Sequence, residues 1–583
     1  MSNAAKTIQP QTDIATKTVS LDRCLPWLLA ATAILVVFYQ LGSAALFEPD
    51  EGRNAEKARE ILLLSDWLTP HENFYPVLDK PMLFYWLIAL SYKLFGVSEW
   101  AARLTSALAA LGCVLAVYIF TRIHWGKAQA LWSALILLTS LEFFMFARLV
   151  IFDMLLTFIL TLALSAFYLA GRCENVDRRR LLCLVMYMAL GVATLIKGLI
   201  GIVLPGMVIF CYLLLTQCWS VLRRINLLPG VLLFCAIVLP WYLAMGAHHE
   251  GYLRYYFWEE HFGRYMSEEF GRTEPWYYFI LAGLIGFFPW TLLWPWLIAG
   301  FRRRAWDDQT LFLLLWAGLP LLFFSASKSK LPHYILPIFP ALAMLTASRL
   351  VSLLDQFVDR VKRALSLTRI AYGLVVLYFL IGYWLPAILP REIIPAVLGM
   401  PRGLRLYGVV ILIVTAILSW AQISLRRSGK GQIFLAQTVI MIAFIVFTAH
   451  AMIAASAAHS AKAAGETARS LLTDNTQVVV YDTYLAGLAF YLRSDEPIWV
   501  ITRDKRKRTF LGNYYTLGER AVPEIRWGQA LFDFDEFGVA WRAAKRPVLV
   551  LAHSKRRAQL EQQVGLATRK LASVGTYVWL TKN

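Results

Sequence analysis

The sequence predicts a polytopic α-helical membrane protein of about 13 transmembrane helices, with a small α/β domain at its C-terminal end. Of its 583 residues, 58% are hydrophobic and only 16% are charged, which is more apolar surface than a soluble domain can bury. The apolar residues come in successive runs of about 17 to 25, the length of helix that crosses ~30 Å of hydrocarbon. After about residue 455 these runs give way to short strand-like segments.

The first span begins at Leu25, after a polar tail of residues 1–24 that we expect in the cytoplasm. A cleavable signal peptide is not predicted, because the first apolar run is too long for one. The spans form one transmembrane domain over residues 25–454. They are expected near residues 25–45, 99–121, 128–147, 154–171, 181–196, 198–216, 228–247, 276–300, 310–325, 333–354, 369–389, 404–424 and 432–454.

The net charge of +19 is distributed in a way that indicates membrane topology rather than a nucleic-acid partner. Basic residues gather in every second short connection, as cytoplasmic loops do under the positive-inside rule. The clusters are Arg122 and Lys127; Arg172, Arg178, Arg179 and Arg180; Arg223 and Arg224; Arg302, Arg303 and Arg304; Arg360, Lys362 and Arg363; and Arg426, Arg427 and Lys430. In an inner membrane, the loops 47–98 and 248–275, the segment 326–333 and the C-terminal region are then periplasmic.

The apolar segment 81–95, PMLFYWLIALSYKLF, is predicted to lie in the membrane interface or to be re-entrant. Trp86, Tyr92 and Lys93 suit the headgroup zone. If this segment crossed the bilayer, every later basic cluster would face outside. We therefore keep it within the periplasmic loop 47–98.

Residues 455–583 are expected to form a periplasmic α/β domain. The segments TQVVVYD, EPIWVI, PVLVLAH and GTYVWL have the pattern of short strands, and polar or helical stretches separate them. The basic run 503–508, RDKRKR, suits either a solvated loop or contact with anionic headgroups, and both interpretations stay open.

Four groups of charged residues lie at predicted periplasmic ends of spans, where charge at membrane depth calls for a functional hypothesis. The first group is Asp50, Glu51 and Arg53 in FEPDEGRNAEKARE, and the second is Asp79 and Lys80 in YPVLDKP. The third group is Arg148 and Asp153 in ARLVIFD. The fourth group is Glu260, His261, Arg264, Lys328, Lys330, His333 and Tyr334 in EEHFGRY and SKSKLPHY. A helix bundle can bring these ends into one cavity. Carboxylates there act as a general base or bind a cationic substrate group, while Lys and Arg stabilise a phosphate leaving group. The pattern favours glycosyl transfer from a lipid phosphate.

Each of these residues has a structural alternative. Asp50 is a good N-cap for the helix that follows it. Asp153 could be the ion-pair partner of Arg148, five residues earlier. His261 suits a ligand, a phosphate donor or an interface histidine equally. Lys328 and Lys330 run against the positive-inside tendency, which favours a functional role.

The ordered set of motifs resembles the aminoarabinose lipid A transferases, which belong to the C-type glycosyltransferases together with the protein O-mannosyltransferases. The motifs are PDEGR, DKP followed by YW, R..IFD, LIKG at Lys197, EEHFGRY, FFPW at Pro289 and Trp290, and SKSKLPHYILPIFPALA. The resemblance covers most of residues 25–350 and rests on layout beyond them. Met82 departs from the family, which usually has a second proline there.

The resemblance implies a C-type glycosyltransferase fold and a specific reaction. A sugar, expected to be 4-amino-4-deoxy-L-arabinose, passes from undecaprenyl phosphate to lipid A phosphate at the periplasmic face, giving resistance to polymyxin and cationic peptides. Asp50 and Asp153 correspond to the paired essential aspartates of the family. Lys80 and Arg264, helped by Tyr334, correspond to the clamp on the carrier phosphate. Glu51, Arg53, Arg148, Lys197, His261, Lys328, Lys330 and His333 are further site candidates.

No cofactor is required by the sequence, although the resemblance implies a divalent metal, zinc or magnesium, near this region. Asp79, Glu260 and His261 are the candidate ligands, without a compact ligand spacing. The seven cysteines all precede residue 240 in predicted spans or cytoplasmic connections, so neither a disulfide framework nor a zinc pair is expected. The expected partners are the lipid-linked donor, lipid A or a related glycolipid, and membrane lipids. The protein itself is expected to be a monomer.

Two other functions are alternatives. A transferase for another sugar or acceptor, such as a protein O-mannosyltransferase, fits the same residues. A transporter for a lipid-linked sugar fits less well, because such folds often have internal repeats and charged sites near the midplane. This sequence has no matching halves, and its charged groups lie at span ends.

Overall fold

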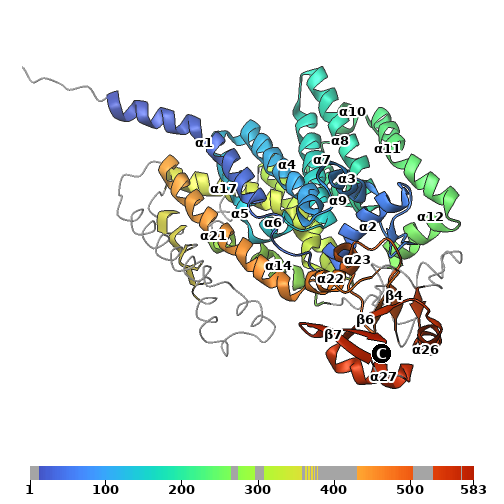
Figure 1. The fold of residues 1–583 in the computed structure, drawn as a ribbon. Helices are drawn as coiled ribbons and strands as arrows, with labels where there is room; N and C mark the ends of the chain where they lie inside the picture. Colours follow the sequence, from blue (N-terminus) through green and yellow to red (C-terminus); the bar gives the residue numbers. More distant parts are fainter. Residues whose placement is uncertain are drawn as a thin grey trace, which may run out of the picture.

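The structure, a computed structural model, describes residues 12–263, 274–295, 307–356, most of 361–377, 430–473, 475–502, 530–565 and 568–582. Figure 1 shows two parts: a body of packed helices, and a smaller part of strands and short helices formed by the C-terminal residues. The predicted spans 369–389 and 404–424, apart from a few residues up to 377, the basic run 503–508 and part of the span 276–300 fall outside the described residues.

Within the described residues, seven helical segments are long and apolar enough to cross a membrane. They are α4 (Glu99–Trp125), α7 (Phe152–Arg172), α8 (Val176–Lys197), α11 (Leu227–His248), α16 (Asp308–Ala326), η4 (Pro332–Ile338) continued by α17 (Phe339–Gln356), and α21 (Lys430–Ala458). Shorter apolar helices occupy residues 23–38 within α1 (Thr12–Phe38), α3 (Leu83–Phe95) and α9 (Ile200–Thr216). The predicted span 128–147 is instead interrupted at Ser140, between α5 (Lys127–Thr139) and α6 (Leu141–Phe146).

The outer faces of these helices are apolar, as contact with lipid requires. In α4, the side chains of Leu108, Leu115, Ile119 and Ile123 recur at helical spacing and are exposed. The opposite face buries small residues such as Ala110 against its neighbours. An exposed apolar stripe of this length would be a liability in water and is stable against hydrocarbon chains.

Short elements join the long helices. These are α10 (Val221–Arg224), α12 (Tyr252–Arg254), the π-helical segment η1 (Tyr255–Gly263), α14 (Tyr278–Gly286) and the 3-10 segment η2 (Trp290–Leu293).

The loop after α1 carries the elements that build the site. It contains α2 (Asp50–Leu64), the hairpin of β1 (His71–Glu72) with β2 (Tyr75–Pro76), and α3. At 13 residues, α3 is about 20 Å long and too short to cross the bilayer, in agreement with the prediction for 81–95. By contrast, α2 is charged and yet buried along most of its length. Its charges must therefore be paired inside the protein.

The C-terminal part contains a six-stranded sheet in the order β5-β4-β3-β6-β8-β7. The strands β3 (Gln477–Tyr481), β4 (Trp499–Ile501), β5 (Leu531–Phe532) and β6 (Val548–His553) are parallel, whereas β7 (Thr568–Val574) and β8 (Tyr577–Lys582) pair antiparallel to each other, with β8 beside β6. Its central strands β3 and β6 are nearly continuous apolar runs, as strands covered on both faces are. The four predicted strand segments coincide with β3, β4, β6 and β8, and the sequence did not predict β5 and β7.

Among the described residues, the helices that accompany this sheet are α22 (Lys462–Arg469), α23 (Leu488–Leu492), α26 (Phe534–Ala543) and α27 (Arg557–Val564). Of these, α23 packs directly on α2, far from it in sequence. Gly52 and Gly487 meet so closely that a Cβ on Gly52 would lie 2.6 Å from the Gly487 nitrogen. The hydroxyl of Tyr491 also accepts the Leu46 N–H at 2.7 Å. The C-terminal region thus fixes the helix on which the site is built.

Candidate active site

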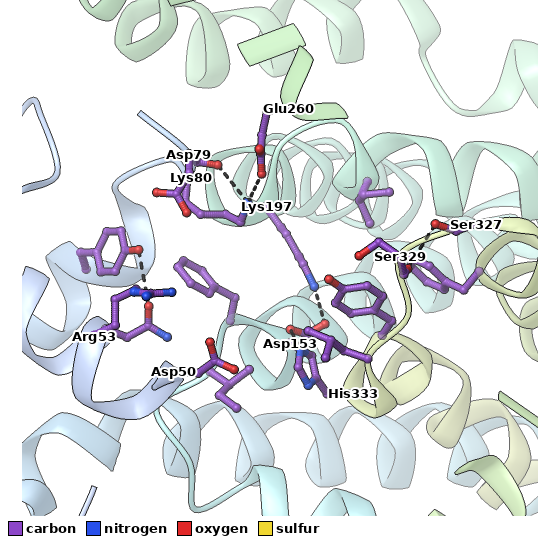
Figure 2. A pocket seen from close by; sticks show the side chains of 18 of the residues that line it. Asp50, Arg53, Asp79, Lys80, Asp153, Lys197, Glu260, Ser327, Ser329 and His333 are labelled. Atoms are coloured by element: carbon purple, nitrogen blue, oxygen red, sulfur yellow. Dashed lines mark hydrogen bonds and ion pairs between the residues drawn. The ribbon is translucent and has the colours of Figure 1, made fainter. Parts of the chain in front are cut away.

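One pocket gathers residues from all four charged groups of the sequence (Figure 2). The predicted residues that line it are Asp50, Arg53, Asp79, Lys80, Asp153, Lys197, Glu260, His333 and Tyr334. They come from α2, the segment before α3, α7, α8, η1 and η4. Residues almost 300 positions apart in the chain therefore share one cavity.

One face of α2 forms a wall of this pocket. Asp50, Arg53, Asn54 and Lys57 all line it, at the spacing i, i+3, i+4 and i+7 that places side chains on one side of a helix. Asn54 joins this wall to the rest of the bundle, because its Nδ2 donates to the carbonyl of Val150 at 2.8 Å. Asn54 and Lys57 were not among the predicted site residues, although their helical spacing from Asp50 places them on the same face of α2.

Asp50 is the first residue of α2 and not its N-cap. The cap position is Pro49, and no side-chain capping bond is made, so the helix-cap alternative is wrong. Asp153 likewise lies in the first turn of α7. The positive end of the helix dipole favours a carboxylate in both positions. Both aspartates line the pocket, with Asp50 on the α2 side (Figure 2).

Asp153 has a basic side chain next to each of its oxygens. Its Oδ1 lies 2.5 Å from Nζ of Lys197, and its Oδ2 lies 3.7 Å from Nε2 of His333. Lys197 is the last residue of α8, which ends there because Gly198 adopts a φ of +72° that L side chains rarely take. The same ammonium lies 4.7 Å from the centre of the Tyr334 ring.

Arg148 is therefore not the partner of Asp153, and the alternative that paired them is wrong. Its Nη1 donates to the carbonyls of Val36 and Val37, at 3.3 and 3.1 Å, near the end of α1. Because these last carbonyls of a helix lack partners within the helix, the arginine closes the end of α1.

A second set of ion pairs lines the pocket next to the α2 wall. Nζ of Lys80 lies 2.9 Å from Oε1 of Glu260, and Nζ of Lys57 lies 3.1 Å from Oδ1 of Asp79. Burial alone raises the pKa of Asp79, but the ammonium groups of Lys57 and Lys80 outweigh it and hold that pKa below its usual value. Lys80, the predicted phosphate clamp, is thus held by the Glu260 carboxylate.

Several candidates lie outside the residues that line the pocket. Glu51 forms a two-pronged ion pair with Arg103 of α4, with contacts of 2.9 and 2.8 Å, and holds α2 against the bundle. Lys330 is buried and donates to the carbonyls of Glu274 and Ser327, at 2.9 and 2.6 Å. Lys328 is exposed. Arg264 and the side chain of His261 fall outside the described residues.

The side chains that the structure describes do not fit a metal ion. Among them, no three of the histidine, cysteine, aspartate and glutamate residues gather as ligands would. The carboxylates of Asp79 and Glu260 are already neutralised by Lys57 and Lys80.

Some pocket residues lie in the motifs YW and SKSKLPHYILPIFPALA, but the sequence predicted no role for them. Tyr85, Ser327 and Ser329 line the cavity from α3 and from the segment after α16. Serines and tyrosines at span ends are common, so only the fold distinguishes these three from others like them.

Comparison with known proteins agrees with this architecture. The family model described as dolichyl-phosphate-mannose-protein mannosyltransferase matches residues 79–243. The solved structure of ArnT from Cupriavidus metallidurans bound to undecaprenyl phosphate is 27% identical and superposes with a TM-score of 0.80, covering 95% of this chain and 97% of that one. The chain therefore has the ArnT-like, mostly helical C-type glycosyltransferase fold, as the motifs predicted.

Curated relatives bear the name undecaprenyl phosphate-alpha-4-amino-4-deoxy-L-arabinose arabinosyl transferase. The relative from Aeromonas salmonicida is 33% identical over 359 residues, and the match covers 60% of this chain and 64% of that relative, slightly less than two thirds of it. The relative from Pectobacterium carotovorum subsp. carotovorum is 30% identical over 427 residues, covering 72% of this chain and 75% of that relative. The chain is thus a multi-pass membrane protein that belongs to the family of undecaprenyl phosphate-alpha-4-amino-4-deoxy-L-arabinose arabinosyl transferases.

Proposed function

We propose that this chain transfers 4-amino-4-deoxy-L-arabinose from undecaprenyl phosphate to a phosphate group of lipid A. The observation that carries the proposal is the pocket in which Asp50 and Asp153 lie with Lys80, Lys197 and Arg53. Two carboxylates suit an amino sugar, and several cations suit phosphate groups. The names of the relatives supply the sugar and the carrier.

In this reaction, an oxygen of the acceptor phosphate attacks C1 of the sugar. The bond between C1 and the oxygen of the carrier phosphate breaks, and its electron pair stays on that phosphate. Cations stabilise the charge that develops there. We assign this role to Lys80, Arg264 and Tyr334. When the donor binds, its phosphate takes the place of the Glu260 carboxylate on Lys80, because the two anions compete for one ammonium.

The two aspartates have different tasks in this proposal. A phosphate monoester has its second pKa near ~6, so the acceptor phosphate is already mostly dianionic and needs no general base. Asp50 instead holds the ammonium of the sugar and orients C1. Asp153, bound to Lys197 and His333, keeps that lysine directed into the pocket.

The proposal extends to the arrangement of the chain in the membrane. The chain crosses the inner membrane about 13 times over residues 25–454, and the pocket lies at the periplasmic face. Residues 1–24 are cytoplasmic, residues 455–583 form a periplasmic α/β domain, and the enzyme acts as a monomer. Addition of the cationic sugar lowers the negative charge of lipid A, which gives resistance to polymyxin and other cationic peptides.

A second candidate is transfer to a protein hydroxyl, which the mannosyltransferase family model over residues 79–243 favours. A hydroxyl must lose a proton during attack, so Asp50 would then serve as general base. Mass spectrometry of lipid A from cells with and without the gene separates the two candidates. Lipid A that carries an aminoarabinose only when the gene is present supports the proposal, and unchanged lipid A together with newly glycosylated protein supports the second candidate.

A further inference from the structure

A buried carboxylate, Glu72, lies behind the α2 wall of the pocket. Its Oε1 accepts a hydrogen bond from Nε of Arg53 at 3.0 Å, and its Oε2 lies 3.6 Å from Nζ of Lys57. The residue is 1% exposed, so its charge is stable only because cations and donors surround it. Glu72 belongs to the hairpin and does not itself line the pocket, whereas Arg53 and Lys57 do.

A residue from the distant C-terminal region completes this arrangement. The hydroxyl of Tyr484, which follows β3, donates to the same Oε1 of Glu72 at 3.2 Å. Burial, and then the charge of Glu72, raises the pKa of Tyr484 well above its usual value, so the phenol stays neutral and remains a donor. One carboxylate oxygen therefore receives both the guanidinium of Arg53 and the hydroxyl of Tyr484.

The C-terminal region also holds the hairpin at its turn. Nδ2 of Asn73 donates to the carbonyl of Ile498 at 2.9 Å, and the Ile498 N–H donates back to Oδ1 of Asn73 at 2.8 Å. These reciprocal bonds fix the position of Glu72, the preceding residue. The carboxylate is thus fixed through its backbone and through its side chain.

A fixed Nε contact orients the whole guanidinium of Arg53, because the group is planar and rigid. In Figure 2, Arg53 lies beside Asp50 and below Asp79 and Lys80. The reaction brings two phosphates to the site, and the carrier phosphate is assigned to Lys80. The guanidinium on the α2 side therefore suits the other phosphate, that of the acceptor.

We infer that Glu72 and Tyr484 are positioning residues that hold Arg53 toward the acceptor phosphate, so that the C-terminal region completes the active site. The inference rests on the proposed function and adds to it a residue for the acceptor and a task for the region after residue 455.

The test compares Tyr484→Phe with Tyr491→Phe in full-length protein purified in detergent. Both changes remove one hydroxyl that bonds the N-terminal part of the chain, but only Tyr484 touches Glu72. The KM and kcat for lipid A and for the lipid-linked donor are measured, together with lipid A binding in the absence of donor. Tyr484→Phe is expected to raise the KM and the Kd for lipid A about two- to tenfold, the effect of one hydrogen bond, with little change in the KM for the donor. Tyr491→Phe should leave these acceptor constants unchanged.

A double-mutant cycle distinguishes positioning from general loss of stability. If Tyr484 acts through Arg53, then Tyr484→Phe has no further effect on the lipid A constants in an Arg53→Ala background. Glu72→Gln should weaken lipid A binding, and Glu72→Asp should restore part of it. Equal effects of the two tyrosine variants, or full additivity with Arg53→Ala, would overturn the inference.

The outcomes also separate this inference from the proposed function. A wild-type protein that binds lipid A, with the Tyr484 dependence described, but does not turn over the donor supports the inference and refutes the proposed reaction. If the wild-type protein transfers the sugar and Tyr484→Phe has no effect on the lipid A constants, the result supports the proposed reaction and refutes the inference. If the wild-type protein does not bind lipid A, the assignment of Arg53 is wrong.

Discussion

Oδ1 of Asp153 lies 2.5 Å from Nζ of Lys197, so the first turn of α7 is joined to the last residue of α8 inside the pocket. The contact gives Asp153, one of the two predicted catalytic carboxylates, a cationic partner from another helix. Asp50, on the other side of the pocket, starts α2 and makes no capping bond. The two aspartates thus have different surroundings and should respond differently to substitution.

Asp50→Asn and Asp153→Asn should each reduce transfer by at least about a hundredfold, because each removes a charge that faces the reacting sugar or fixes a cation beside it. Asp153→Asn should also lower the thermal stability, because Lys197 loses its charged partner. Transfer to lipid A and the unfolding temperature in detergent are the measurements. The control is Asp177→Asn, at a largely exposed carboxylate of α8. Normal activity in either active-site variant would remove that residue from the catalytic set.

If Lys80 binds the carrier phosphate, substitutions of Lys80 and of its partner Glu260 should change the binding of undecaprenyl phosphate in opposite directions. Lys80→Ala and Arg264→Ala should each weaken binding of undecaprenyl phosphate about tenfold or more, the effect of one charge-assisted hydrogen bond. Glu260→Gln should strengthen it, since the carboxylate that competes for Lys80 is gone. Binding of undecaprenyl phosphate to purified protein measures both effects. Weaker binding in Glu260→Gln would mean that this carboxylate helps to hold the carrier.

The stability of the protein should depend on Glu48, which lies where α2 meets the C-terminal region. Burial raises the pKa of Glu48 from the usual 4.5 to about 8, and the N–H groups of Gly487 and Ala486 offset only part of that rise. The folded protein then keeps a proton that the unfolded chain loses above about pH 4.5. The unfolding free energy should therefore fall as the pH rises from about 4.5 to about 8 and then level off.

In the Glu48→Gln variant, the side chain at this position does not ionise, so the unfolding free energy should depend less on pH. Unfolding temperatures in detergent, measured at several values between pH 5 and pH 9, compare the variant with the wild type. The stability of the variant relative to the wild type should increase as the pH rises to about 8 and then stay constant. Parallel curves would show that Glu48 is ionised in the folded protein, with the charge balanced by Arg53.

The proposed topology predicts which sites an impermeant thiol reagent can reach in intact spheroplasts. A single cysteine at Ser470, which is exposed beside the C-terminal sheet, should be labelled. A cysteine at Ser220, exposed between α9 and α10, should be labelled only after the membrane is broken. Both positions are tested in a cysteine-free background. Labelling of Ser220 in intact spheroplasts would place the pocket on the wrong side of the membrane.

Most charged residues of the pocket could be predicted from the sequence, because the membrane topology restricts where charged residues lie. Positive-inside parity placed the groups around Asp50, Lys80, Asp153 and His333 on one face, and the structure brings them to one pocket. The spacing from Asp50 to Lys57 is also a local property that the sequence contains. The short length of α3 follows from its residues in the same way.

The partners within the site could not be predicted, since they depend on how distant helices approach each other. Arg148 is five residues from Asp153, yet its guanidinium binds the carbonyls at the end of α1. Lys197, 44 residues away, takes its place beside Asp153. Nor does any local pattern connect Tyr484 with Glu72, because that contact exists only after the C-terminal region has docked.

Transfer in detergent, where no compartments exist, tests the central claim most directly. Purified protein is mixed with undecaprenyl phosphate-linked aminoarabinose and lipid A, and the products are measured by mass spectrometry. We predict that lipid A gains one aminoarabinose and that undecaprenyl phosphate is released in equal amount, with Asp50→Asn inactive. An intact donor in the presence of folded wild-type protein would contradict the account and would leave transport of the lipid-linked sugar as the better explanation.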